Sequence, residues 1–338
     1  MNRIIKLIIL ITFLGSGCYD AKEMSLGDED EITVIADSAE WGKFRPLLEQ
    51  VFEREIFTPQ REKLLRLRWF PPGKFPEKIR QKNLLIISTL SNQGRTTQLI
   101  KDILDNSIID KMRNNEIYVI TENDHFARDQ KLMILASWDE PGLKKHITDN
   151  SFFLYDIFDQ AVNRRAASRV LGKRSRNRLS KTIMEKHGFS FKIPLDYSII
   201  LDDPDQRILW LASHGTRRWF LVYWEEVGDI PVIEVDWVIN KRNELGVTLF
   251  DSIRVNEDYI IEDRILINEW VVLKVSGLYE KINDQLGGPF VSFLFYDETS
   301  SRLYYLDGAV FSPGEEKLKF LRTLELMARS FITSNGNS

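Results

Sequence analysis

The sequence is nearly devoid of cysteine. Cys18 is the single cysteine among 338 residues, so the chain cannot form an internal disulfide and cannot hold a metal between thiolates. Its four histidines, His125, His146, His187 and His214, are too far apart for any two to form the i,i+4 pair of helical metal sites. These scarcities predict that the chain has no metal site.

Common catalytic and nucleotide-binding motifs are missing as well. Each glycine–lysine pair lacks the serine or threonine that completes a P-loop, and there is neither a Gly-x-Ser-x-Gly elbow nor a Gly-x-Gly-x-x-Gly fingerprint. We therefore expect no bound cofactor. Whether the chain is an enzyme stays open, with a non-enzymatic role favoured.

Long apolar segments and an excess of positive charge are also lacking. The apolar run at residues 7–14 is too short for a transmembrane helix, which needs roughly 20 apolar residues. The chain has 46 basic and 50 acidic residues, whereas a nucleic-acid-binding domain carries a strongly basic surface. We expect no nucleic-acid partner.

The amino terminus contains an export signal. Two basic residues precede the apolar run, and residues 15–17 (Gly-Ser-Gly) stand directly before Cys18. This order is that of a secretory signal peptide, and a cysteine at its end is typical of bacterial lipoproteins, in which the thiol is acylated. We expect residues 1–17 to be removed and Cys18 to carry fatty acids such as palmitate.

Residues 18–31 are predicted to be the lipidated cysteine and a flexible tether, because they are polar, acidic and without periodicity. Two or three acyl chains anchor a protein stably. Tyr19 follows the cysteine where an aspartate would signal retention in the inner membrane. The sequence thus predicts a cell-envelope protein that is anchored in the outer membrane rather than the inner one.

The remaining chain predicts an α+β fold. Residues 32–187 alternate between short apolar strands, such as 84–87, and amphipathic helices. Residues 188–333 contain mostly strands with turn signals and end in an amphipathic helix that includes Leu321 and Leu324. Residues 164–181 carry eight basic and no acidic residues. We expect two mixed α/β modules with largely antiparallel sheets, joined by a long basic helical stretch.

Several motifs of the second module resemble those of a known family. They are residues 277–279 (Gly-Leu-Tyr), 286–292 (LGGPFVS) and 306–314 (LDGAVFSPG). Together they are similar to uncharacterised bacterial lipoproteins that are grouped as a domain of unknown function, and the resemblance covers most of the mature chain. The resemblance implies a lipid-anchored envelope protein and carries no assigned reaction.

The same motifs supply the candidate ligand or partner surface. Adjacent glycines let the backbone turn sharply and approach another group closely. Nearby side chains could add polar and aromatic contacts. The predicted surface comprises Tyr279, Asp284, Gly287, Gly288, Phe290 and Asp307.

A second candidate is an anion contact after His214. Arg217 and Arg218 offer two guanidinium groups that suit a carboxylate or phosphate. A hairpin with charged strand ends would have the same sequence.

Three functions remain open. The first is a non-enzymatic scaffold or binding module for an unknown envelope protein or polymer, held to the membrane by its lipid. The second is an envelope hydrolase or transferase that uses carboxylates such as Asp284 and Asp307. The third is binding of an anionic surface through the basic helical stretch.

Overall fold

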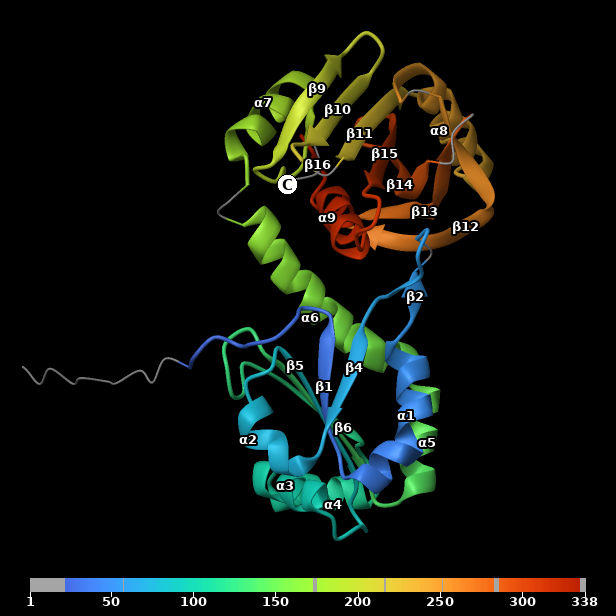
Figure 1. The fold of residues 1–338 in the computed structure, drawn as a ribbon. Coiled ribbons are helices and arrows are strands. Elements are labelled where there is room, and N and C mark those ends of the chain that lie inside the picture. Colours follow the sequence, from blue (N-terminus) through green and yellow to red (C-terminus); the bar gives the residue numbers. More distant parts are fainter. Residues whose placement is uncertain are drawn as a thin grey trace, which may run out of the picture.

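The computed structural model describes residues 22–56, 58–172, 175–215, 217–250, 252–282 and 286–334. Cys18 and Asp284 lie outside these residues. The chain forms two lobes, each with its own sheet, and helix α6 (Ser151–Leu171) runs from the first lobe to the second (Figure 1). The α+β class is confirmed.

The first lobe contains a five-stranded sheet in the order β4-β1-β5-β7-β6. Three of its four strand pairs are parallel, because helices connect successive strands, and only β6 runs antiparallel to its neighbour. The elements are β1 (Glu31–Ile35), α1 (Ser38–Phe52), β2 (Glu55–Ile56), β3 (Glu62–Lys63), β4 (Arg66–Phe70), a 3₁₀ helix (Pro72–Lys74), α2 (Phe75–Lys78), β5 (Asn83–Thr89), α3 (Arg95–Ile103), α4 (Asn106–Arg113), β6 (Val119–Asn123), β7 (Lys131–Ser137) and α5 (Glu140–Asp149).

Strand β5 forms the centre of the first core. Every residue of it is buried, as expected for a strand with helices on both faces. Leu85 and Ile87 pack in the cluster that contains α1, α5 and α6, whereas Leu84 and Ile86 pack in the cluster that contains α3 and α4.

The second lobe contains a seven-stranded antiparallel sheet in the order β12-β13-β14-β15-β11-β10-β9. Antiparallel pairing therefore predominates over the chain as a whole. The elements are α7 (Asn177–His187), β8 (Phe189–Ser190), β9 (Tyr197–Asp203), β10 (Ile208–Ser213), β11 (Arg217–Glu226), α8 (Val235–Leu249), β12 (Ile253–Ile267), β13 (Trp270–Lys281), β14 (Gly287–Asp297), β15 (Arg302–Phe311), α9 (Leu318–Arg329) and β16 (Ile332–Thr333).

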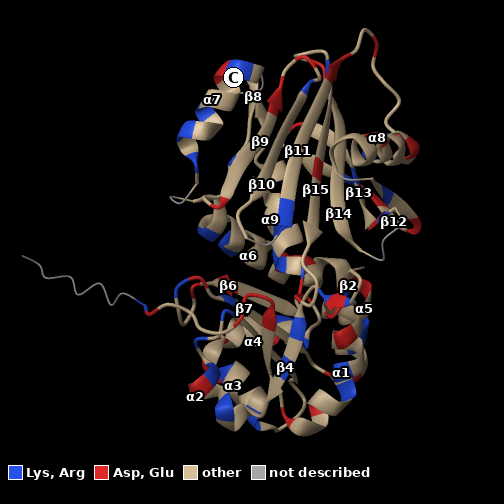
Figure 2. Ribbon diagram, turned by 45° about the horizontal axis from the view of Figure 1, so that its top comes forward, with Lys and Arg blue, Asp and Glu red and all other residues tan. Residues whose placement is uncertain are grey.

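Alternation along the strands gives this sheet two apolar faces. In β11, Phe220 and Val222 pack with α9, whereas Leu221 packs with α8. Figure 2 shows that the strands are largely uncharged and that acidic and basic residues gather on helices and at strand ends. The sheet is thus covered by α9 on one face and by α8 on the other.

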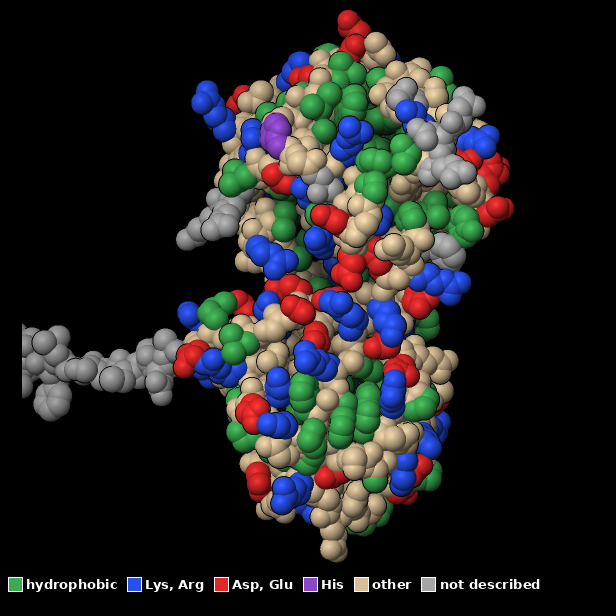
Figure 3. Space-filling view, viewed as in Figure 1, with side chains coloured by type: hydrophobic (Ala, Val, Ile, Leu, Met, Phe, Trp, Pro, Cys, Tyr) green, Lys and Arg blue, Asp and Glu red, His purple; other side chains and the backbone are tan. Residues whose placement is uncertain are grey.

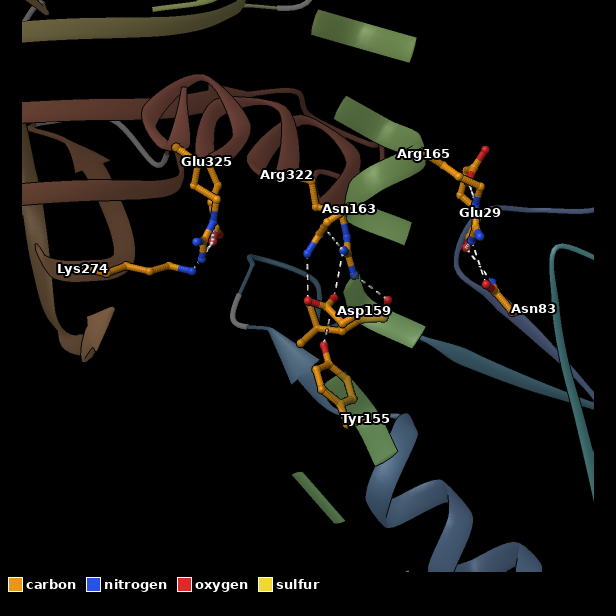
Figure 4. A network of polar contacts seen from close by, with 11 residues as sticks. Glu29, Asn83, Tyr155, Asp159, Asn163, Arg165, Lys274, Arg322 and Glu325 are labelled. Atoms are coloured by element: carbon orange, nitrogen blue, oxygen red, sulfur yellow. Dashed lines mark hydrogen bonds and ion pairs between the residues drawn. The ribbon is translucent and has the colours of Figure 1, made fainter. Parts of the chain in front are cut away.

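The lobes contact each other through α9. The Glu62 carboxylate of β3, which is 8% exposed, accepts hydrogen bonds from the backbone N–H groups of Lys317 and Leu318 at 2.8 Å. It therefore caps the amino terminus of α9 across the junction. One turn further, Arg322 donates to Asp159 of α6 at 3.0 Å (Figure 4).

Part of the segment that was predicted to be a flexible tether packs on the first lobe. Residues 23–30 lie against the first lobe, where the Ser25 N–H donates to the Arg128 carbonyl at 2.9 Å. Glu29 accepts from Arg165 at 2.8 Å (Figure 4) and pairs with Lys82 at 2.9 Å. The acidic residues of this segment led us to expect a solvated tether. In the structure, the acidic side chain of Glu29 instead pairs with basic side chains of the lobe.

Of the basic stretch, residues 164–171 belong to α6 and residues 177–181 to α7, whereas Lys173 and Arg174 lie outside the described residues. Arg165 is 7% exposed, and both Arg165 and Arg169 pair with Glu29. Lys181 lies 3.7 Å from Glu185. Part of the positive charge is thus neutralised within the chain. Among the described residues, no helix is long and apolar enough to cross a membrane.

Candidate ligand-binding site

The candidate site lies where α8 ends on its face of the second sheet. Val238, Arg242 and Leu245 are buried at helical spacing and hold α8 against the strands. At Gly246 a Cβ atom would lie 2.2 Å from the Ile253 carbonyl oxygen. Glycine thus lets α8 approach the start of β12, and the sheet beyond the helix end is left to form a pocket.

This pocket has a volume of about 360 Å³. Hydrophobic side chains reach the surface of the second lobe in several places (Figure 3). Strand ends of β10, β11, β13, β14 and β15 and the end of α8 supply the walls. The lining residues are Trp210, Ala212, Ser213, Arg217, Arg218, Trp219, Leu249, Phe250, Ile253, Tyr279, Lys281, Leu286, Gly287 and Phe311.

Aromatic rings make up much of the wall. The Phe250 ring stacks on Trp219 at 5.2 Å between centroids and meets Trp210 edge-on at 4.9 Å. Trp219 also lies 5.5 Å from Tyr279. Such contacts fix the rings relative to one another, so the pocket has a defined aromatic surface.

The polar groups of the pocket are mainly donors. Burial raises the pKa of Tyr279, and its hydroxyl donates to the Val310 carbonyl at 3.1 Å. The indole N–H groups of Trp210 and Trp219 are buried and have no acceptor in the part of the chain that the structure describes. Each unsatisfied buried donor costs about 1–3 kcal/mol of stability. Two such donors on neighbouring side chains are unusual, because most buried polar groups have a hydrogen-bond partner.

The two predicted anion contacts separate. Arg217 is exposed, and its guanidinium lies over the Phe311 ring at 5.8 Å. Because side chains alternate along a strand, Arg218 lies on the opposite face of the sheet from Arg217. There it pairs with Asp196 at 2.5 Å, and its guanidinium lies over the Phe320 ring of α9 at 4.6 Å. Arg217 is therefore the guanidinium on the pocket side, and Arg218 is held in the α9 packing.

The adjacent glycines allow β14 to pack closely. A Cβ atom on Gly288 would lie 2.0 Å from the Val310 carbonyl oxygen, and one on Gly287 would lie 2.2 Å from the Tyr279 carbonyl oxygen. Side chains at either position would displace backbone. The glycines thus serve strand packing, and Gly287 also lines the pocket.

Phe290 and Asp307 do not line this pocket and are buried, each 1% exposed. Asp307 forms an ion pair with Arg242 and accepts from Ser292 at 2.7 Å and from Tyr305 at 3.2 Å. Burial opposes the charge of Arg242, but the Asp307 carboxylate outweighs it and raises the pKa of Arg242. Asp307 is therefore part of a structural ion pair.

Trp210, Trp219 and Phe250 were missed as site residues from the sequence. A signal was present, because Trp219 pairs with Ala212 across the hairpin and so shares a face with Trp210. Phe250 could not be placed without knowing where α8 packs. No group of three metal-ligating side chains occurs within the described segments.

Two family profiles match the chain. A profile described as a domain of unknown function (DUF4837) matches residues 176–330, and another, a domain of unknown function (DUF8532), matches residues 25–171. Two domains of unknown function cover most of the chain. The two matches meet between α6 and α7. No curated protein matches the chain.

Two solved structures share limited similarity. A protein from Bacteroides thetaiotaomicron is 12% identical over 43% of this chain and 45% of its own, with a TM-score of 0.26. The Saccharomyces cerevisiae Ran-binding protein Mog1p is 12% identical over 44% of this chain and 90% of its own, with a TM-score of 0.32. The chain thus spans less than half of the Bacteroides protein, and at these scores neither likeness carries an argument.

Proposed function

We propose that the protein is a non-enzymatic binding protein of the cell envelope and is anchored through Cys18. Its second lobe binds a partner or ligand at the aromatic pocket. One observation carries the binding role. Arg217, Tyr279 and Gly287, which the sequence placed in two separate candidate regions, line a single pocket. The anchor rests on the signal sequence that ends at Cys18. Placement in the outer membrane rests on Tyr19.

A binding role accounts for Asp307 better than catalysis does. A general acid or base must reach its substrate, but the Asp307 side chain is 2% exposed. Its Oδ1 accepts from Ser292 and Tyr305, and its Oδ2 pairs with Arg242. The carboxylate is committed to holding α8 on the sheet, which leaves a hydrolase or transferase without support from this residue.

The basic stretch also supports the pocket as the binding site. Arg165 and Arg169 pair with Glu29, and Arg176 donates to the Leu195 carbonyl at 3.0 Å. These three cations are therefore engaged by other groups of the same chain. Binding of an anionic surface through residues 164–181 is therefore the weaker alternative.

Photo-crosslinking in whole cells tests the proposed function. The full-length chain carries p-benzoylphenylalanine in place of Leu286, which lines the pocket and is 43% exposed. The matched control carries it in place of Phe152 on the first lobe, which is 78% exposed.

An adduct that forms from position 286 and not from position 152 supports the proposal, and its mass distinguishes a macromolecule from a small compound. Equal adducts from both positions, or none from position 286, contradict it.

A further inference from the structure

We propose that the occupant of the pocket is an aromatic anion, with its ring among the pocket's aromatic side chains and its negative group at Arg217. This inference rests on the proposed function and names the ligand class. It follows from the charge, the hydrogen-bonding groups and the shape of the wall.

The charged residues among the described lining of the pocket are basic. Among the described lining residues, Arg217, Arg218 and Lys281 are basic and none is acidic, although the Arg218 side chain lies on the α9 face. Arg218 is paired with Asp196 on the opposite face. Arg217 makes no ion pair with any described residue and contacts the ring of Phe311. Its guanidinium can therefore bind a carboxylate or phosphate in the bidentate manner that suits it.

The hydrogen-bonding groups also favour a ligand that accepts. The indole N–H groups of Trp210 and Trp219 are buried without an acceptor in the described segments. The Tyr279 hydroxyl already donates to Val310. These indole N–H groups are fully covered, so the donor that an acceptor group of the ligand can reach is the exposed guanidinium of Arg217.

The wall selects a flat apolar body. The Phe250 ring lies 4.9 Å from the Trp210 ring and 5.2 Å from the Trp219 ring. Aromatic pairs in offset or edge contact are stabilised beyond the effect of the area that they bury. The volume of about 360 Å³ is at the small end of pockets that hold small molecules. A fused-ring carboxylate is thus a suitable probe.

Equilibrium dialysis of the purified full chain in mild detergent tests the class with three probes. These are 2-naphthoate, its uncharged counterpart 2-naphthamide, and decahydro-2-naphthoate, which keeps the charge and lacks the aromatic rings. Detergent alone in the protein chamber corrects for partition into micelles. We expect 2-naphthoate to bind more tightly than either of the other two compounds.

Arg217→Gln isolates the contribution of the guanidinium. We expect it to weaken 2-naphthoate about tenfold, which is what loss of one charge-assisted contact produces, and to leave 2-naphthamide within about twofold. Arg178→Gln is the matched control, since it removes the same charge from an exposed position on α7. It should leave all three affinities unchanged.

Equal affinity for 2-naphthoate and 2-naphthamide, equal affinity for the saturated acid, or an unchanged affinity in Arg217→Gln would each overturn the aromatic-anion class. If no probe binds while the adduct from position 286 forms, the class fails and the proposed binding function stands. If that adduct is absent, the binding function itself fails, whatever the dialysis shows.

Discussion

Arg242 of α8 and Asp307 of β15 form an ion pair inside the second lobe, with each side chain 2% exposed. The Arg242 guanidinium also lies 4.1 Å from the centre of the Phe290 ring and 5.5 Å from that of Tyr279. The pair therefore joins the helix that ends at the pocket to the strands that form its floor.

Breaking this pair should destabilise the protein strongly. Arg242→Met leaves the Asp307 carboxylate buried without its cation, and we expect the free energy of unfolding to fall by about 3–5 kcal/mol. The double variant Arg242→Met, Asp307→Leu removes both charges and should recover most of the loss. Urea unfolding measures both values. A single variant that loses under about 1 kcal/mol would mean that the carboxylate is already compensated by its other donors.

The close packing of β14 predicts opposite effects at two glycines. Gly288→Ala places a Cβ atom 2.0 Å from the Val310 carbonyl oxygen, and the resulting backbone shift should cost about 1–3 kcal/mol. Gly42→Ala lies inside α1 with no atom within 4 Å of the new Cβ, and it should stabilise by about 0.5–1 kcal/mol. Thermal unfolding compares the two. A melting temperature that shifts in the same direction in both variants would contradict the close packing at Gly288.

The amino-terminal segment should be held by a pH-dependent contact. Burial raises the pKa of Glu29, but Arg165 and Lys82 outweigh it and hold this pKa below its usual 4.5. The contact therefore makes its full contribution to the stability of the folded protein above about pH 4.5. This contribution is lost as the pH falls through the lowered pKa of Glu29. The difference in unfolding free energy between the parent and Glu29→Gln should narrow from pH 7 to pH 3. A difference that does not change with pH would contradict the assignment.

The proposed lipid anchor depends on the single thiol of Cys18. We expect Cys18→Ala to abolish acylation, which incorporation of labelled palmitate measures, and to release the protein from the membrane pellet. The variant should keep the thermal stability of the acylated chain, since the buried core clusters are formed by residues from Ile32 onward. Continued sedimentation of Cys18→Ala with membranes would show that another feature holds the protein there.

The sequence predicted elements well where burial dictates the pattern. The apolar run around Leu85 is a strand with helices on both faces, and the amphipathic spacing of Leu321 and Leu324 is helix α9. Strand β12 was not predicted, because it lies at the edge of the sheet and most of its residues are exposed, Glu262 and Asp263 among them. Alternation is weak where neither face is fully covered.

The pocket was beyond prediction for a different reason. Arg217 and Gly287 are 70 positions apart in the sequence, and they meet only because β11, β15 and β14 are neighbours in the sheet. Phe250 joins them because α8 ends there. Such a site depends on tertiary arrangement, which local patterns do not contain.

Native mass spectrometry of the full chain, released from its own membranes in mild detergent, tests the central claim most directly. The account predicts an added mass of a small compound on the parent protein and on Arg178→Gln, and its loss in Arg217→Gln. A parent protein that carries no such mass, or one that Arg217→Gln retains equally, would contradict a ligand held at the aromatic pocket.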